Sequence, residues 1–218
     1  MDISLTEENY IKAIFSISSQ NGGNGVSTNE LSGQLNNKAG SVTDMLKRLA
    51  EKKLINYQKH KAVTLTPQGK KDAIKVIRKH RLWEYFLVDK LKYKWDEVHD
   101  IAEQMEHVQS NDLIDRIDDF LGNPKFCPHG DPIPNKAGKF ENIKAISLSK
   151  AELHKTYHIR RFKNSDDDFL KILDKKGIKL NGKITVKDIE PYDKTFTVML
   201  GEKLQLLSEK IVEQIMIS

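Results

Sequence analysis

The order of amphipathic segments in the first 65 residues constrains the fold of this chain more than any other sequence feature. Apolar side chains recur there at helical spacing in three segments and at strand spacing in two more. These segments are residues 5–18, 28–36, 41–53, 54–58 and 62–65. Three helices followed by a hairpin are typical of a winged helix-turn-helix, in which the third helix enters the major groove of DNA. We therefore expect a DNA-binding domain at the start of the chain.

The side chains around the third helix predict how such a domain would contact DNA. Ser41 and Thr43 lie near the start of this helix, where base edges are reached, whereas nearby hydroxyl and lysine side chains are placed for phosphates. The phosphate-contacting candidates are Ser27, Thr28, Lys38, Lys47, Lys59 and Lys61, the last two flanking His60 in the hairpin tip. The net charge of +5 permits a polyanionic partner. Because neither Arg nor Gln opens the third helix, sequence preference is expected to depend on weak contacts and DNA shape.

The rest of the chain predicts more helices and then a small β domain. Thr66 followed by Pro67 starts a long helix. We expect helices over residues 67–91, 96–109, 112–121 and 167–176, a Pro- and Gly-rich linker over 124–138, and β-runs over 145–148, 179–186 and 196–199. The fold class is therefore mainly α with small β parts. The expected domains are 1–66, DNA-binding; 67–123, helical; 124–140, linker; and 141–218, a small β domain.

Composition narrows the class of protein and its compartment. The chain has 218 residues, 38% of them hydrophobic and 31% charged. No apolar run approaches the roughly 18 residues that a membrane helix needs, and the first residues lack the pattern of a signal peptide. A single cysteine, Cys127, fits a reducing compartment. We expect a cytoplasmic protein that does not bind membranes.

Four side chains in the 96–109 segment suggest a metal site. His99, Glu103, Glu106 and His107 are spaced i, i+4, i+7 and i+8, which places them within an arc of about 100° on one helical face. Oxygen and nitrogen ligands of this kind suit Mn²⁺, Fe²⁺ or Zn²⁺. The alternative for this helix alone is a solvated acidic face.

Further metal-ligating residue types favour the metal site over that alternative. His80 and Glu84 form an i, i+4 pair in the preceding helix. Cys127 and His129 alternate in the linker, where residues two apart in an extended chain point the same way. An acidic run, residues 166–168, opens the short helix of the β domain.

Five stretches of the chain together resemble the diphtheria toxin repressor family. They are residues 8–14, 78–84, 97–100, 106–108 and 127–134, the last reading Cys-Pro-His-Gly-Asp-Pro-Ile-Pro. The resemblance is greatest to the three-domain, manganese-responsive branch and covers nearly the whole chain in order. The C-terminal part would correspond to the SH3-like domain of that family, with a much weaker match.

The resemblance implies two metal sites in each subunit of a homodimer. The ligands of the primary site would be Asn9, His80, Glu103, Glu106 and His107. Those of the second would be Glu84, Cys127, His129 and an acid of the SH3-like domain, for which Asp168 is preferred to Asp166. His99 matches an ancillary ligand of the iron-responsive members.

At three positions the residue differs from the one found in a particular branch of the family, and these differences bear on which metal is bound. Asn9 stands where manganese-responsive members have a carboxylate and iron-responsive ones a methionine. Lys12 stands where some two-domain members place a second carboxylate, which argues against their two-metal cluster. Glu103 replaces a cysteine of the iron-responsive members, and a hard carboxylate favours Mn²⁺ over Fe²⁺. We expect Mn²⁺, with Fe²⁺ as the alternative and Zn²⁺ as a possible surrogate.

The expected function is a metal-dependent repressor that binds operator DNA as a homodimer and takes no organic substrate. Acidic groups would repel without metal, and metal would clamp the DNA-binding domain in one orientation. Repression itself comes from the resemblance. Two other classes remain: a metal hydrolase using His80, Glu84, Glu103 and His107, which lacks a marked nucleophile or oxyanion site, and a metal-independent winged-helix protein.

Overall fold

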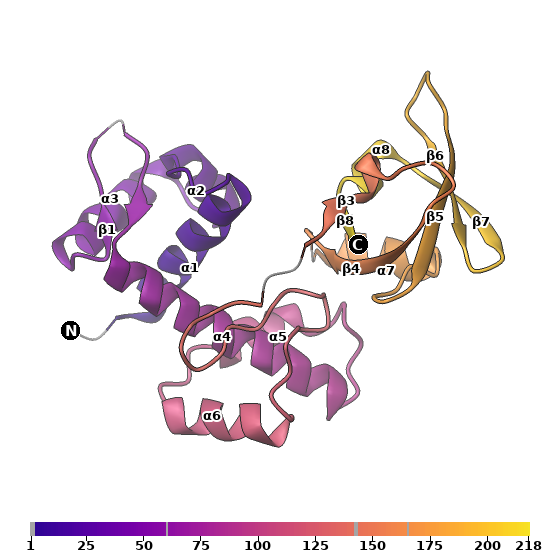
Figure 1. Cartoon of the computed structure of the whole chain (residues 1–218). Helices are drawn as coiled ribbons and strands as arrows, with labels where there is room; N and C mark the ends of the chain where they lie inside the picture. The colour runs from indigo at the N-terminus through magenta and orange to yellow at the C-terminus, as the bar shows by residue number, and fades with distance from the viewer. Residues whose placement is uncertain (1–2, 60, 142–143, 165) are drawn as a thin grey trace. The chain divides into compact units, whose positions relative to one another are not determined.

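The computed structural model describes residues 3–59, 61–141, 144–164 and 166–218 (Figure 1). The chain divides into two compact units, described separately below. The first unit comprises Met1–His80, Glu103–Arg116 and Pro134–Lys139, and the second comprises Arg81–Ala102, Ile117–Ile133 and Phe140–Ser218. Among the described residues, no helix has both the length and the apolar character needed to cross a membrane.

Three helices form the beginning of the first unit. They are α1 (Leu5–Gln20), α2 (Thr28–Gln34) and α3 (Ala39–Glu51). Ser4 and Ser27 each form a capping box with the glutamate three residues later, which satisfies the first amide groups of α1 and α2. The helices bury one apolar core, to which the fully buried Ile11, Leu31 and Leu46 contribute. The expected sequence of three helices is confirmed, although α3 begins two residues earlier than predicted.

A short hairpin follows α3 and completes the winged helix-turn-helix (Figure 1). Strand β1 (Ile55–Asn56) pairs antiparallel with β2 (Thr64–Leu65). Each strand has only two residues, so the runs predicted over 54–58 and 62–65 are longer than the observed strands. His60, which was part of the predicted tip, lies outside the described residues.

The long helix α4 (Pro67–Asp89) begins in close contact with the chain that leads into the hairpin. The Thr66 hydroxyl accepts a hydrogen bond from the Gly69 amide at 3.1 Å and also contacts the backbone carbonyl of Leu54. A Cβ atom at Gly69 would lie only 2.9 Å from the carbonyl carbon of Leu54 and closer still to its oxygen. Glycine is therefore required here by close backbone approach.

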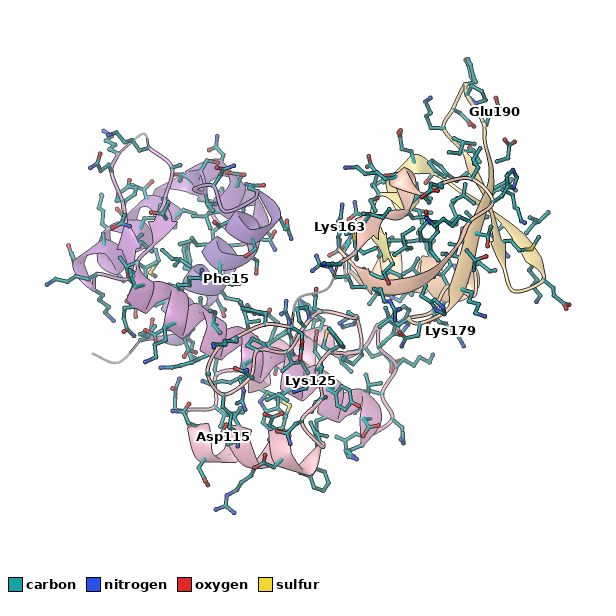
Figure 2. The ribbon with its side chains drawn as sticks, in the orientation of Figure 1. Phe15, Asp115, Lys125, Lys163, Lys179 and Glu190 are labelled. Atoms are coloured by element: carbon teal, nitrogen blue, oxygen red, sulfur yellow. The ribbon has the colours of Figure 1, made fainter. Side chains whose placement is uncertain are left out.

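Helix α5 (His99–Met105) is shorter than the predicted segment 96–109. Before it, the Glu97 carboxylate accepts a hydrogen bond from the Lys94 amide in a turn. After it, the Ser110 hydroxyl accepts from the Leu113 amide and caps α6 (Asn111–Phe120). Because the chain must leave one helix before the next can be capped, α5 ends well before residue 109. Asp115, which Figure 2 labels on α6, forms an ion pair with Arg78 at 2.9 Å.

The C-terminal part of the second unit is a small antiparallel sheet with the strand order β3-β8-β4-β5-β6-β7. The strands are β3 (Ile146–Ser147), β4 (Thr156–Phe162), β5 (Lys183–Ile189), β6 (Phe196–Leu200), β7 (Lys203–Leu207) and β8 (Ile215–Ile217). The short helices η1 (Leu148–Lys150), α7 (Asp167–Lys175) and α8 (Glu209–Val212) complete it. Figure 2 shows Glu190 in the projecting hairpin of β5 and β6.

The sheet confirms the predicted small β domain but contains strands that the sequence pattern did not indicate. Strand β4 buries Tyr157, Ile159 and Phe162, and its pairing with β8 shifts register after Ile159. The irregularity breaks the two-residue alternation by which a strand is recognised. Strands β7 and β8 were likewise missing from the prediction, because β8 is short and β7 alternates only weakly.

Candidate metal centre

Glu106 lies at the centre of a group of charged side chains in the first unit. Its carboxylate is completely buried. The Lys12 ammonium is 2.6 Å from Glu106 Oε1, 2.9 Å from Glu106 Oε2 and 2.5 Å from Glu103 Oε1. His80 Nδ1 is 2.6 Å from Glu106 Oε2. We call His80, Glu103, Glu106 and His107 the Glu106 cluster.

His107 joins this cluster through a carboxylate that sequence reasoning missed. Its Nδ1 lies 2.6 Å from Glu8 Oε2, and Gln109 donates to the other oxygen of Glu8 at 3.2 Å. The other ring nitrogen, His107 Nε2, lies 3.9 Å from Glu106 Oε1. The contact of Nδ1 with Glu8 is the carboxylate–histidine pairing that orients imidazole ligands of metals. In the sequence, nothing local distinguishes Glu8 from Glu7, the other acid in the first turn of α1.

Asn9 lies on α1 between Glu8 and Lys12, the two residues of this helix that contact the cluster, and bears on whether a metal fits. Its Oδ1 atom is buried and has no hydrogen-bond partner among the described residues. An unsatisfied buried oxygen costs about 1–3 kcal/mol, so such an atom calls for a partner. Together with two carboxylates and two imidazoles, an amide oxygen makes a donor set that suits a divalent cation. The residues present therefore fit a metal.

Two expectations about this cluster require correction. Glu106 and His107 follow the end of α5 at Met105, so the four predicted side chains do not share one helical face. Tertiary contacts with α1 and α4 bring them together instead. In addition, the carboxylates of Glu103 and Glu106 do not simply repel each other, because the Lys12 ammonium lies between them.

A second group, the Glu84 cluster, consists of Glu84, Cys127 and His129 in the second unit. All three are buried, and each offers a ligand atom within 4.8 Å of the other two. His129 Nδ1 is 3.3 Å from Glu84 Oε1, and Cys127 Sγ is 3.9 Å from His129 Nδ1. The remaining ring nitrogen, Nε2, lies 2.8 Å from the Trp95 carbonyl oxygen, which fixes the ring orientation. His99 Nδ1 is 3.7 Å from the same Glu84 oxygen.

The backbone around His129 is a turn, so the expected extended linker is wrong at this point. The Gly130 amide donates to the Cys127 carbonyl at 2.9 Å, and the Phe162 amide donates to the His129 carbonyl at 3.2 Å. Gly130 has φ of +86°, which favours glycine. A Cβ atom there would lie 2.7 Å from the Cα of Arg161, in strand β4. Close packing of the turn on this strand therefore positions both ligand candidates.

Electrostatics in the Glu84 cluster depend on burial and on the Glu84 charge. Burial alone disfavours a charged imidazole, but hydrogen bonds to Cys127 and Glu84, with their charges, raise the pKa of His129 to about 11. Burial, followed by the Glu84 charge, raises the pKa of the Cys127 thiol. Any metal bound by these groups would have to displace their protons.

The predicted acidic ligand from the C-terminal domain is not brought into this cluster. Asp168 is exposed and lies outside the group of three. Asp166 is also exposed and accepts a hydrogen bond from Asn164 at 3.0 Å. The side chain of Asp167 lies outside what the structure describes. The participation of Asp168 therefore stays a prediction.

The predicted DNA-contacting side chains surround α2, α3 and the hairpin. Ser41, Lys38, Lys59 and Lys61 are exposed. Others already have local partners: the Ser27 hydroxyl donates to Glu30, the Thr43 hydroxyl donates to the Ala39 carbonyl, and Lys47 pairs with Asp44 at 3.0 Å. Thr28 is half-buried at the start of α2. Lys38 directly precedes α3, so a cation stands at the entry to the expected recognition helix.

Comparison with known proteins gives matches along almost the whole chain. Residues 2–63 match the family model of the iron dependent repressor N-terminal DNA binding domain. Residues 66–135 match the model of the iron dependent repressor metal binding and dimerisation domain, and residues 146–218 match that of the FeoA domain. A solved manganese-dependent transcriptional repressor in complex with manganese has 33% identity and a TM-score of 0.88, covering 96% of this chain and 98% of that one. ScaR with bound Cd²⁺ has 29% identity and a TM-score of 0.81, covering 97% and 98%.

Among curated proteins, the iron-dependent repressor IdeR of Mycobacterium leprae is 33% identical over 135 residues. That match covers 61% of this chain and 57% of the relative, so the chain spans little more than half of it. A winged helix-turn-helix combined with clusters of carboxylate, imidazole and thiol groups defines a class of metal-responsive, DNA-binding transcriptional regulators. Within that class, the chain belongs to the diphtheria toxin repressor family, also called the iron-dependent repressors.

Proposed function

We propose that this protein is a Mn²⁺-responsive transcriptional repressor that binds operator DNA as a homodimer in the cytoplasm, without enzymatic activity. The observation that carries the proposal is the Glu106 cluster. In it, two carboxylates and two histidines from separate parts of the chain converge, and α1, which contacts them through Glu8 and Lys12, also carries the unsatisfied amide oxygen of Asn9. A divalent cation is the ligand that such a donor set fits.

The first metal would be held by Asn9, His80, Glu103, Glu106 and His107. The second would be held by Glu84, Cys127 and His129, with Asp168 and His99 as further ligands.

We assign DNA binding to residues 1–66, the metal sites and dimerisation to 67–123 with the 124–140 linker, and an SH3-like domain to 141–218. Because Asn9 belongs to the DNA-binding part, a bound metal would favour one orientation of that part over others. Metal affinity and DNA affinity would then be linked reciprocally.

The choice of Mn²⁺ rests on ligand chemistry and on the character of the relatives. Glu103 supplies a hard carboxylate, and hard oxygen ligands favour Mn²⁺ over metals that prefer thiolate. Several similar solved structures are described as manganese-dependent or manganese-activated repressors. The main alternative is Fe²⁺, which is supported by the similarity to IdeR. A metal hydrolase is not favoured, because the family to which the chain belongs consists of DNA-binding transcriptional regulators.

The test is DNA binding measured by fluorescence anisotropy while the metal-free protein is titrated with Mn²⁺, anaerobic Fe²⁺ or Zn²⁺. The DNA probes are the promoter upstream of its own gene and that of any neighbouring metal transporter. Tight binding with Mn²⁺ that is lost in Glu103→Ala/His107→Ala is expected. A matched control, Glu209→Ala/His154→Ala, removes the same residue types from exposed positions of the second unit and should bind like the wild type.

Two results would change the proposal. Binding that follows Fe²⁺ but not Mn²⁺ would replace the metal and keep the function. Equal binding in excess chelator would refute the metal switch and leave a constitutive winged-helix protein.

A further inference from the structure

Lys12 is the one participant in the Glu106 contacts to which the proposed function gives no role. Its ammonium group contacts both oxygens of Glu106 and one oxygen of Glu103, and its side chain is 15% exposed. Ammonium groups donate three hydrogen bonds, and these three contacts account for all of them. Lys12 is therefore bound at the point where the two carboxylates converge.

We infer that Lys12 is a built-in competitor of the metal, an internal cation that must leave the carboxylates of Glu103 and Glu106 before a divalent ion can bind them. The inference rests on the proposed function of this site. It assigns Lys12 the role of setting the metal concentration at which the protein responds.

Mutual exclusion follows from the contact distances. A hard divalent cation binds carboxylate oxygens at about 2.0–2.6 Å. The Lys12 nitrogen already lies 2.5–2.9 Å from the oxygens that such an ion would use. Both cations bound to the same oxygens would be only a few ångströms apart, where like charges repel strongly in a partly buried site. The two cations therefore alternate.

The burial of Glu106 explains why an internal cation is needed. A fully buried carboxylate without a counter-charge is strongly unfavourable, and the Lys12 ammonium supplies that charge. The lysine stem is long and flexible, and its partial exposure gives the ammonium a route to water when a divalent ion takes over. Metal binding must then include breaking a buried ion pair, which weakens the affinity below that of the ligand set alone.

The first experiment measures Mn²⁺ affinity by competition with a chelator for the wild type, Lys12→Gln and the control Lys52→Gln. Lys52 also forms a part-buried ion pair with α1, at 2.7 Å from Glu7. We expect Lys12→Gln to bind Mn²⁺ about tenfold more tightly or better, and Lys52→Gln to match the wild type. In excess chelator, Lys12→Gln should melt at a lower temperature, because Glu106 loses its counter-charge. A purely structural lysine would lower both the stability and the metal affinity.

A second measurement uses the unmodified protein and so does not depend on the folding of a variant. Reductive methylation of lysines, read by mass spectrometry, reports the accessibility of each ammonium group. Lys12 should react slowly in chelator and faster with saturating Mn²⁺, whereas Lys52 should react equally in both.

The outcomes separate this inference from the proposed function. If the wild type binds Mn²⁺ and loses binding in Glu106→Ala, the metal site stands. Unchanged or weaker binding by Lys12→Gln, or no change in Lys12 reactivity, would then overturn the competition alone. Failure of the wild type to bind Mn²⁺ or any other divalent ion at Glu106 would overturn both.

Discussion

Replacing Gly130 with alanine should disrupt the Glu84 cluster by pushing its turn away from strand β4. The added Cβ would lie 2.7 Å from the Cα of Arg161 and closer still to the carbonyl oxygen of Arg160. Both are backbone atoms and cannot rotate away. The φ of +86° adds strain, because L-residues rarely adopt it. The turn, and with it His129, must therefore move.

The size of the effect follows from adding these two costs. A left-handed backbone costs a non-glycine residue about 1–2 kcal/mol, and overpacking against fixed neighbours adds about 1–3 kcal/mol. Gly130→Ala should therefore lower the free energy of unfolding by about 2–5 kcal/mol. Gly122→Ala is the matched control, since Gly122 has φ of +76° but no atom within 4 Å of its Cβ position. It should lose only about 1–2 kcal/mol, the cost of strain without collision.

The assay is urea unfolding in excess chelator, combined with a Cd²⁺ titration that follows the ultraviolet thiolate-to-metal charge-transfer absorbance of Cys127. Gly130→Ala should lose the charge-transfer band, while Gly122→Ala keeps it. Equal destabilisation by the two substitutions would show that Gly130 tolerates a Cβ and would refute the packing argument. An intact band in Gly130→Ala would show that the turn does not position the ligands.

Three further predictions concern the two clusters and α1. Glu8→Ala should lower Mn²⁺ affinity by about 10–100-fold, because His107 loses the partner that orients its ring. Glu7→Ala should leave the Mn²⁺ affinity unchanged, and calorimetric titration of the two variants measures the difference. Metal binding by the Glu84 cluster should strengthen as pH rises, because the raised pKa values of Cys127 and His129 keep these groups protonated and the metal must displace the protons. A Cd²⁺ affinity that does not change with pH would contradict this prediction. Burial raises the pKa of Glu7, but the interactions with its lysine and serine partners lower the pKa by a larger amount, so the net pKa is below the ordinary value of 4.5. The Glu7 contribution to stability should thus be present above about pH 4.5 and lost as pH falls through the lowered pKa, so Glu7→Gln should flatten the acid limb of a stability profile.

Helix starts were the part of the fold that local sequence predicted best. The serine cap of α2 and the Thr66–Pro67 start of α4 depend on residues within one turn of each other, so the pattern contains the whole interaction. Helix and strand ends within the second half were predicted less well. The end of α5 depends on the capping of the next helix by Ser110, and β4 depends on a register shift that only its partner strand defines.

The candidate metal centre was predicted by residue type and missed in its electrostatics. Glu103, Glu106 and His107 were singled out because histidines and carboxylates at short spacing are conspicuous, whereas His80 was assigned to the same site through the family resemblance. Its contacts with Glu8 and Lys12 join residues more than 90 positions apart, and nothing in one sequence without relatives signals them. Asn9 was proposed only through the family resemblance, and its unsatisfied oxygen now gives a physical reason for that proposal.

The close packing of Gly69 against Leu54 has a consequence for how α4 can vary. It locks the first turn of the helix to the base of the hairpin, and His80 follows 13 residues after Pro67 on the same helix. At 1.5 Å and 100° per residue, His80 stands about 20 Å along the axis in a fixed rotational phase. Insertion or deletion of one residue between Gly69 and His80 would rotate His80 by about 100° about the helix axis, away from Glu106. Over this stretch, natural variation should therefore proceed by substitution and leave the residue count unchanged.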